Sequence, residues 1–294
     1  MTLTIRRIGR AIPRPAIGAL WAGLAMSGCT ITVTTDDITP EYADSAADTY
    51  QNKVVDGGVT GRFAVQNTDT GQIRTTPAKL RISPDRQTAF LEIDGIDIRL
   101  EASPSDPATA SSGTYLLDLT HLLNAAAGFD GTTYLSSVVM RNFSGQQEAS
   151  VGILGALTRP EQIEALSSTA SYEGSWFVTD NGTTTGDVVT IFDSFEMAVD
   201  FAAGSDQVTA TFEQGDVASD FGTLTATVGG NSFVGQLVID PAHPDLSGAL
   251  DVSGAFFGPT AEEVGGILYG DIDSAADGEM QVTGNFLGQE VTAP

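Results

Sequence analysis

The chain has few residues suited to catalysis or metal binding: among its 294 residues there is one cysteine, Cys29, and two histidines, His121 and His243. A single cysteine cannot build an internal disulfide framework, and no Cys/His cluster has the spacing of a zinc site. A Ser–His–Asp arrangement would need one of the two histidines. His121 lies in an expected helical turn, and His243 lies in the loop DPAHPD, where we expect a solvated side chain. No glycine-rich phosphate loop opens a helix. The sequence therefore predicts no enzyme, no cofactor and no metal site.

Long hydrophobic runs are also missing. The apolar run at 16–27 is shorter than the roughly 20 residues that span a bilayer, and it follows four arginines within residues 6–14. A basic leader before a short apolar run is typical of a secretory signal. A serine and a glycine directly precede Cys29, which resembles the lipobox of bacterial lipoproteins. We expect residues 1–28 to be a lipoprotein signal peptide and Cys29 to be the lipid attachment site; the alternative is an incidental cysteine beside an ordinary cleavage site.

Basic residues are absent from the C-terminal part of the chain. Residues 160–294 contain 22 Asp and Glu but no Lys or Arg, and the whole chain has a formal net charge of −25. Such a surface repels nucleic acid and anionic lipid headgroups. We therefore expect no nucleic-acid partner, and contact with a membrane only through the N-terminal lipid anchor. Solubility and the steering of a cationic partner both remain open as explanations of the acidic charge.

The texture of the chain changes near residue 57. Residues 29–56 are polar, acidic and poor in large apolar side chains, which predicts a flexible acidic tether. From there on, short runs that alternate apolar and polar residues are separated by Gly, Asp, Asn, Ser and Thr, and only 118–128 and 157–168 have a helical pattern. The sequence predicts an all-β chain, in which residues 57–160 form a smaller, open, handle-like β-sheet domain and residues 165–294 form a β-barrel.

The barrel is expected from eight runs of period-two alternation, at 170–178, 195–202, 206–213, 221–228, 232–239, 248–257, 264–272 and 279–287. One apolar and one polar face per strand indicate an antiparallel sheet wrapped around its own core with water outside. Eight strands joined by short loops are what a closed up-and-down barrel needs. The strands are shorter than those of a transmembrane barrel and lack aromatic girdles, so we expect an eight-stranded antiparallel soluble barrel.

Small and large residues share the expected inward face of this barrel. Glycines occur there at 174, 235, 254, 266, 270 and 284, and the aromatic residues are Trp176, Phe201, Phe212, Phe233, Phe256 and Phe286. Glycine lets strands coil and makes room for large neighbours. Six inward rings favour a filled barrel, so we expect binding on the loops or on the handle-like domain.

Two acidic stretches in the C-terminal part of the chain are candidates for a functional role. Asp271, Asp273, Asp277 and Glu279 lie in DIDSAADGE, which lacks the ligand spacing of an EF-hand and is expected to be a hairpin connection. A weak calcium site is the alternative. The pair at 262–263 is expected to be surface charge.

Three segments carry a resemblance to a known family. GAFFGPTAEEVGG at 254–266, TASYEGSW at 169–176 and MAVDFAAGSDQVTATF at 197–212 resemble the β-barrel domain of transferrin-binding protein B and related bacterial surface lipoproteins. The resemblance covers roughly residues 165–290. It implies a barrel preceded by a handle-like domain, whereas the full-length receptor lipoproteins carry two such lobes.

The composition and the resemblance together predict a function. We expect a monomeric cell-envelope lipoprotein, anchored in the outer membrane and facing either the cell surface or the periplasm. It would act as a non-enzymatic binding module for an extracellular or periplasmic protein or small solute, such as an iron-carrying host protein or haem. The alternative is a structural or protective outer-membrane lipoprotein without a small-molecule ligand.

Overall fold

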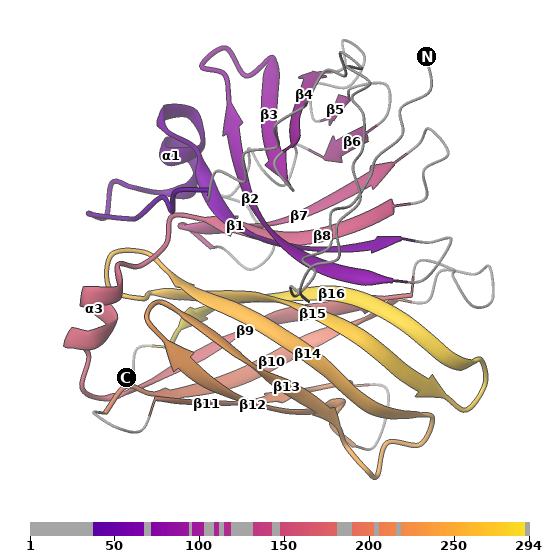
Figure 1. Cartoon of the computed structure of the whole chain (residues 1–294). Helices are drawn as coiled ribbons and strands as arrows, with labels where there is room; N and C mark the ends of the chain where they lie inside the picture. Colours follow the sequence, from indigo (N-terminus) through magenta and orange to yellow (C-terminus); the bar gives the residue numbers. More distant parts are fainter. Residues whose placement is uncertain are drawn as a thin grey trace, which may run out of the picture. The chain divides into compact units, whose positions relative to one another are not determined.

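A computed structural model describes most of the chain between residues 38 and 291 (Figure 1). The described residues are 38–67, 72–93, 96–102, 109–111, 115–118, 132–142, 148–180, 190–202, 206–215 and 219–291. The expected signal peptide and Cys29 lie outside them, as does the helical segment expected at 118–128, which contains His121. Residues Thr35–Pro294 form one compact unit that holds two β-structures.

The first β-structure is an antiparallel sheet with the strand order β4-β3-β2-β1-β8-β7. Its six strands are β1 (Val59–Asn67), β2 (Ile73–Ile82), β3 (Thr88–Ile93), β4 (Ile96–Ala102), β7 (Leu135–Asn142) and β8 (Glu148–Gly155). By themselves, these six long strands form the open sheet that the sequence predicts. Two short strands, β5 (Thr109–Ser111) and β6 (Tyr115–Asp118), pair between the edge strands β4 and β7 and complete the ring.

The tether expected over 29–56 is wrong for residues 41–56, because the chain contacts the first sheet from Glu41 onward, where the Glu41 N–H donates to Thr60 Oγ1 (3.0 Å). Helix α1 (Tyr50–Asp56) begins after Thr49 and buries Tyr50 and Val54 in the core of that sheet. The Ala43 N–H donates to the Leu157 carbonyl (2.8 Å). Two apolar side chains four residues apart lie on one face of a helix. This short pattern was not recognised as a helix because the residues around it are mostly polar and acidic.

The second β-structure is a closed barrel of eight antiparallel strands. Helix α3 (Pro160–Ala165) precedes it, and its strands are β9 (Thr169–Thr179), β10 (Thr190–Asp200), β11 (Gln207–Phe212), β12 (Gly222–Gly229), β13 (Ser232–Ile239), β14 (Leu246–Phe257), β15 (Glu263–Ser274) and β16 (Gly278–Glu290). Each strand pairs with the next, and β16 pairs with β9 to close the ring. All eight predicted strands and the helix expected at 157–168 are confirmed.

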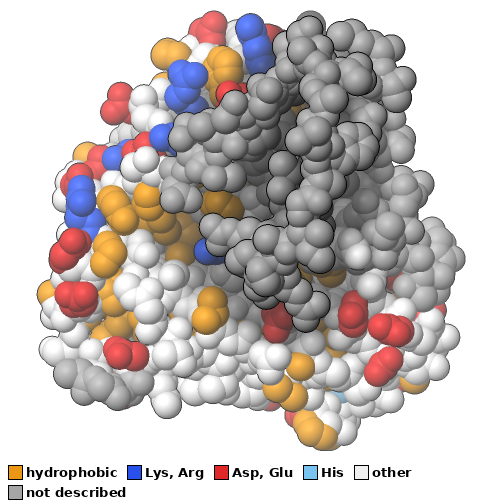
Figure 2. Space-filling model, in the orientation of Figure 1, with side chains coloured by type: hydrophobic (Ala, Val, Ile, Leu, Met, Phe, Trp, Pro, Cys, Tyr) orange, Lys and Arg blue, Asp and Glu red, His pale blue; other side chains and the backbone are white. Residues whose placement is uncertain are grey.

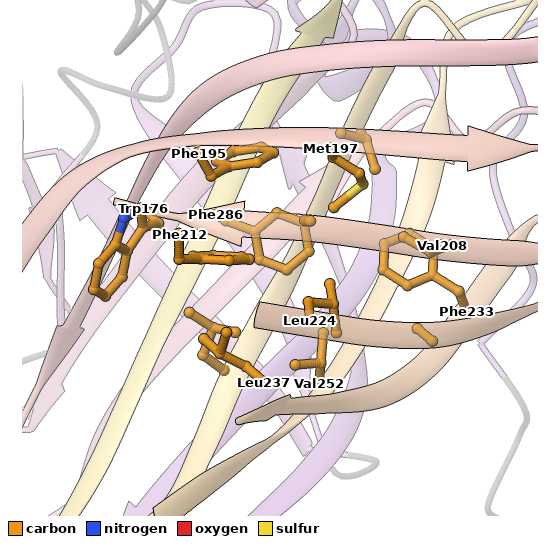
Figure 3. Packing of buried hydrophobic residues seen from close by; sticks show 14 of the residues in the cluster. Trp176, Phe195, Met197, Val208, Phe212, Leu224, Phe233, Leu237, Val252 and Phe286 are labelled. Atoms are coloured by element: carbon orange, nitrogen blue, oxygen red, sulfur yellow. The ribbon is translucent and has the colours of Figure 1, made fainter. Parts of the chain in front are cut away.

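Along the barrel strands, buried apolar residues alternate with exposed polar residues, as the period-two pattern predicts. On β12, Leu224 and Ala226 are buried, while Thr223 and Thr225 between them are exposed. Neighbouring strands repeat this alternation, so that their apolar faces meet inside the ring (Figure 3). All six aromatic residues expected inside are buried.

Candidate functional site

The interior of the barrel is filled by side chains and is not a candidate binding site. The Trp176 ring meets Phe212 edge-on at 5.5 Å between centroids, and Phe195 stacks on Phe212 at 5.4 Å (Figure 3). The Trp176 indole N–H donates to the carbonyls of Ser194 (3.0 Å) and Glu213 (3.2 Å), so its one polar atom is satisfied. Such interlocked rings leave the outer surfaces for binding.

Two glycines of the segment 254–266 make this packing possible. A Cβ at Gly254 would lie 2.2 Å from Cζ of Phe233, and a Cβ at Gly266 would lie 2.6 Å from Cζ of Phe286. The missing side chains are therefore the space that the two rings occupy. This is the role expected for the inward glycines.

The turn inside that segment joins β14 to β15. Gly258 has φ 87° and Ala261 has φ 65°, so the chain reverses through two left-handed residues. The buried Tyr172 hydroxyl donates to the Ala261 carbonyl (2.8 Å), and the Glu262 carboxylate accepts the Thr260 N–H (2.8 Å). These contacts hold an alanine in a conformation that usually favours glycine.

Glu263 is not surface charge, and that expectation is wrong. Its side chain is 3% exposed and leaves the barrel wall toward the first sheet. The carboxylate accepts the backbone N–H groups of Thr133, Tyr134 (2.8 Å) and Leu135 (3.1 Å) at the start of β7. Burial raises the pKa of Glu263 to about 7, although these three hydrogen bonds act in the opposite direction. The carboxylate satisfies donors that would otherwise have no acceptor at the junction of the two β-structures.

Other residues of the same segment complete this junction. Phe257 is 1% exposed and packs in one cluster with Tyr134, Leu135 and Ile153 of the first β-structure. The Gly258 N–H donates to the Ala156 carbonyl (3.0 Å). One face of the segment 254–266 therefore packs inside the barrel, and the other packs on the first sheet.

His243 is a structural residue rather than a solvated one, which corrects the expectation for this loop. The side chain is 8% exposed. Its Nδ1 accepts the N–H groups of Asp245 (3.3 Å) and Leu246 (3.0 Å), so Nε2 is the protonated nitrogen that donates to Gln214 Oε1 (2.9 Å). Because both nitrogens are engaged in holding the loop, this histidine is not arranged as a catalytic base.

The acidic stretch 271–279 forms the hairpin between β15 and β16, as expected. The Ser274 hydroxyl accepts the N–H groups of Ala276 (3.3 Å) and Asp277 (3.2 Å) and closes the turn. Across the described part of the chain, no group of three or more His, Cys, Asp or Glu side chains is placed to hold a metal ion.

An open groove of about 450 Å³ lies on the outer face of the barrel, over strands β9 to β12. One cross-strand row runs along it in the order Glu173, Glu196, Thr211 and Thr223, with each residue directly opposite the next. Ala198 and the small hydroxyl residues beside it form the rest of the floor. This groove is a candidate contact surface on the outside of the barrel.

The basic residues gather on the first sheet, as the sequence predicts. Figure 2 shows the Lys and Arg side chains over its strands. Arg81, Phe90 and Arg99 form one cross-strand row on β2, β3 and β4, with the Arg81 guanidinium 4.5 Å from the Phe90 ring centroid. Arg99 also pairs with Glu101 (2.6 Å). Arginine and aromatic residues are enriched at protein interfaces, and this row of two exposed arginines and a half-buried Phe90 is a second candidate contact surface.

The predicted anchor residue, Cys29, lies outside the described residues, so the structure does not test it. Among the residues that are described, no helix is long and apolar enough to cross a membrane.

Comparison with known families gives a match over the barrel. The model of the C-lobe and N-lobe β-barrels of transferrin-binding protein B matches residues 166–290. These residues are similar to the barrels of transferrin-binding protein B. This matches the resemblance found in the sequence, and the transferrin-binding protein B-type barrel contains the outer groove and the junction segment described above. No curated protein matches the sequence of the chain.

Solved structures of transferrin-binding protein B share the fold. A single-substitution variant from Haemophilus parasuis Hp5 has a TM-score of 0.52 at 18% identity, covering 80% of this chain and 45% of that one. A double variant of the same protein has a TM-score of 0.51 with the same identity and coverage. The protein from serogroup B Neisseria meningitidis has a TM-score of 0.49 at 16% identity, covering 80% of this chain and 44% of that one. This chain thus spans about 45% of the length of the first two structures, and at these identities the likeness shows the fold alone.

Proposed function

We propose that the protein is a cell-envelope lipoprotein that works as a non-enzymatic binding module and contacts its partner through its outer surfaces. The observation that carries this proposal is a transferrin-binding protein B-type barrel whose interior is filled by its own rings. Named structures with this fold are variants of a transferrin-binding protein. An iron-carrying host protein is therefore the first partner to test, followed by haem proteins and other solutes.

The described polar groups support binding rather than catalysis. Glu263 is occupied by three backbone donors, and both nitrogens of His243 are engaged within its loop. A catalytic base needs hydrogen-bond reach to a substrate proton. Neither of these buried groups offers it.

We further propose that residues 1–28 are removed and that Cys29 carries the lipid that holds the protein at the outer membrane. The structure describes the chain from residue 38 onward, so eight residues, 30–37, lie between Cys29 and its described part. At about 3.4 Å per residue, an extended segment of that length reaches roughly 30 Å. The anchor would therefore hold a monomeric two-domain body, with a handle-like domain at 57–160 and a barrel at 165–294, close to the membrane.

The first experiment is protease shaving of intact cells, with lysed cells as the control and an antibody against the barrel as the readout. Cleavage of the barrel on intact cells is the expected result, because a receptor for a host protein must face outward. Survival of the barrel until lysis would contradict a surface receptor and favour a periplasmic role. A Cys29→Ser variant is expected to lose incorporation of a labelled fatty acid and to leave the membrane fraction.

A structural envelope protein without a small ligand is the second candidate. The filled barrel and the buried junction at Glu263 favour it, since side chains of the described chain occupy both the barrel interior and the junction. Purified protein that retains neither transferrin nor haem proteins, in cells whose iron uptake is unchanged by gene deletion, would support this candidate. Saturable binding of either iron source with a defined stoichiometry would exclude it.

A further inference from the structure

The outer groove of the barrel brings two carboxylates of like charge face to face. Glu173 on β9 and Glu196 on β10 are directly opposite in the strand register, and both side chains are exposed. Directly opposed residues of an antiparallel pair have Cβ atoms about 4.5–5.5 Å apart, and like charges in this arrangement repel. Among the described residues, no salt bridge involves either glutamate, and the segment 160–294 holds no Lys or Arg that could neutralise them.

The groove has room for a ligand beside this pair. Its hollow of about 450 Å³ extends from the glutamates over Ala198 to the hydroxyls of Thr209 and Thr211. The Val291 N–H donates to the Ser171 carbonyl (2.7 Å), and this bond holds the end of the described chain against one side of the groove. The floor is therefore made of small side chains, with the carboxylates at one end and hydroxyl acceptors at the other.

We propose that this groove receives a Lys or Arg side chain of a basic partner protein, with the carboxylates of Glu173 and Glu196 on either side of the cation. This inference deepens the proposed function, on which it rests, because it names the chemistry of the partner. Carboxylates on directly opposed residues suit one ammonium or guanidinium group that donates to both, and charge-assisted hydrogen bonds of this kind are short and strong. The remaining N–H donors of the partner would meet the threonine hydroxyls.

The acidic charge on the rest of the barrel also favours a basic partner. Residues 160–294 carry 22 acidic and no basic side chains, so they attract a basic surface from a distance and repel an acidic one. A sugar fits the groove poorly, because its described lining offers no exposed aromatic ring for stacking; the only aromatic lining residue, Tyr172, is buried.

The test uses the purified protein and fluorescein-labelled octalysine, with binding measured by fluorescence anisotropy at several salt concentrations. The variant E173Q/E196Q removes both charges, and D271N/D273N removes two exposed charges from β15 as the matched control. We expect the first variant to weaken octalysine binding by about tenfold, the size of one lost charge-assisted contact, and the control to change it by less than about threefold. Equal weakening in both variants would overturn the proposal, because it would show attraction by net charge alone.

A second pair of variants tests whether binding depends on the space in the groove as well as on its charges. Ala198→Phe fills the floor without changing any charge, and Thr225→Phe places the same ring on the exposed face of β12, at a residue that does not line the groove. Octalysine binding should be lost only in the first. If A198F binds normally while its thermal unfolding is unchanged, the groove is not the site. Stoichiometric binding of Ca²⁺ that is lost in E173Q/E196Q would also overturn the proposal and assign a metal site instead.

These measurements on purified protein do not depend on where the protein lies in the cell. A barrel that resists protease on intact cells would refute the surface receptor, while octalysine binding by the purified protein would still support the basic partner. If the barrel is cleaved on intact cells but octalysine binding does not depend on the groove residues, only the proposal of a basic partner is refuted.

Discussion

Removal of the Glu263 side chain should uncouple the barrel from the first sheet. In Glu263→Ala, the N–H groups of Thr133, Tyr134 and Leu135 lose their acceptor, and the hydrogen bonds to the last two are buried. An unsatisfied buried donor costs about 1–3 kcal/mol, and the variant also removes the cost of burying a carboxylate. For two buried donors and that partial compensation, we expect a loss of about 3 kcal/mol in the free energy of unfolding.

Urea unfolding measures this loss through a single reporter. Trp176 is buried in the barrel, and the only other tryptophan, Trp21, belongs to the predicted signal peptide. The tryptophan fluorescence of the processed protein therefore follows the barrel alone. With a slope of about 3 kcal/mol per molar urea, the midpoint should fall by about 1 M. Hydrogen exchange of the amides at 133–135 should rise at the same time, because their protection depends on the carboxylate.

The neighbouring residue provides the control. Glu262 accepts the Thr260 N–H within its own turn, so Glu262→Ala should cost less than about 1 kcal/mol. Equal effects of the two substitutions, or unchanged exchange at 133–135 in the Glu263 variant, would refute the role given to Glu263. They would show that water replaces the carboxylate at the junction.

Three further predictions concern the same core. Because burial raises the pKa of Glu263 from 4.5 to about 7, the folded protein binds more protons than the unfolded chain between these values. The free energy of unfolding should then fall by up to about 3 kcal/mol as pH rises from 5 to 8, and urea titrations of E263Q should show a flatter slope. Gly266→Val places atoms against the Phe286 ring, where a Cβ lies 2.6 Å away, and should cost at least about 2 kcal/mol in thermal unfolding. Gly229→Ala, with nothing within 4 Å, should stay within about 0.5 kcal/mol. Trp176→Phe leaves two carbonyls without their indole donor and should cost about 1–3 kcal/mol by thermal circular dichroism; an unchanged melting temperature would contradict this.

The barrel could be predicted because its strands bury one face and expose the other. A strand with this pattern cannot shift by one residue without exposing its apolar side chains, so the alternation determines which residues face inward. Leu224 and Ala226 on β12 show this directly, as do Phe233 and Leu237 on β13. The inward aromatic residues followed from the same rule.

The junction could not be predicted because its contacts join distant parts of the chain. The partners of Glu263 lie 128 to 130 residues earlier in the sequence, and a glutamate beside another glutamate carries no local signal of burial. The loop of His243 was missed for a similar reason, since Gln214, its Nε2 partner, lies 29 residues away. Helix α1 was missed because only Tyr50 and Val54 mark its buried face.

The same geometry limits where a partner can bind. Strands β15 and β16 contact β1 and β8 of the first β-structure, so much of their outer face is already covered. On β13, by contrast, Val234 is 65% exposed and Val238 is 49% exposed, and the groove over β9 to β12 is open. Because the interior is filled, the free sheet surface of the barrel among the described residues consists of the outer faces of β9 to β13 and the exposed parts of β14 and β15, such as Asp251 and Asp271. A partner of the barrel must therefore bind to this acidic face or to the loops at its rim, and acidic residues there favour a basic partner.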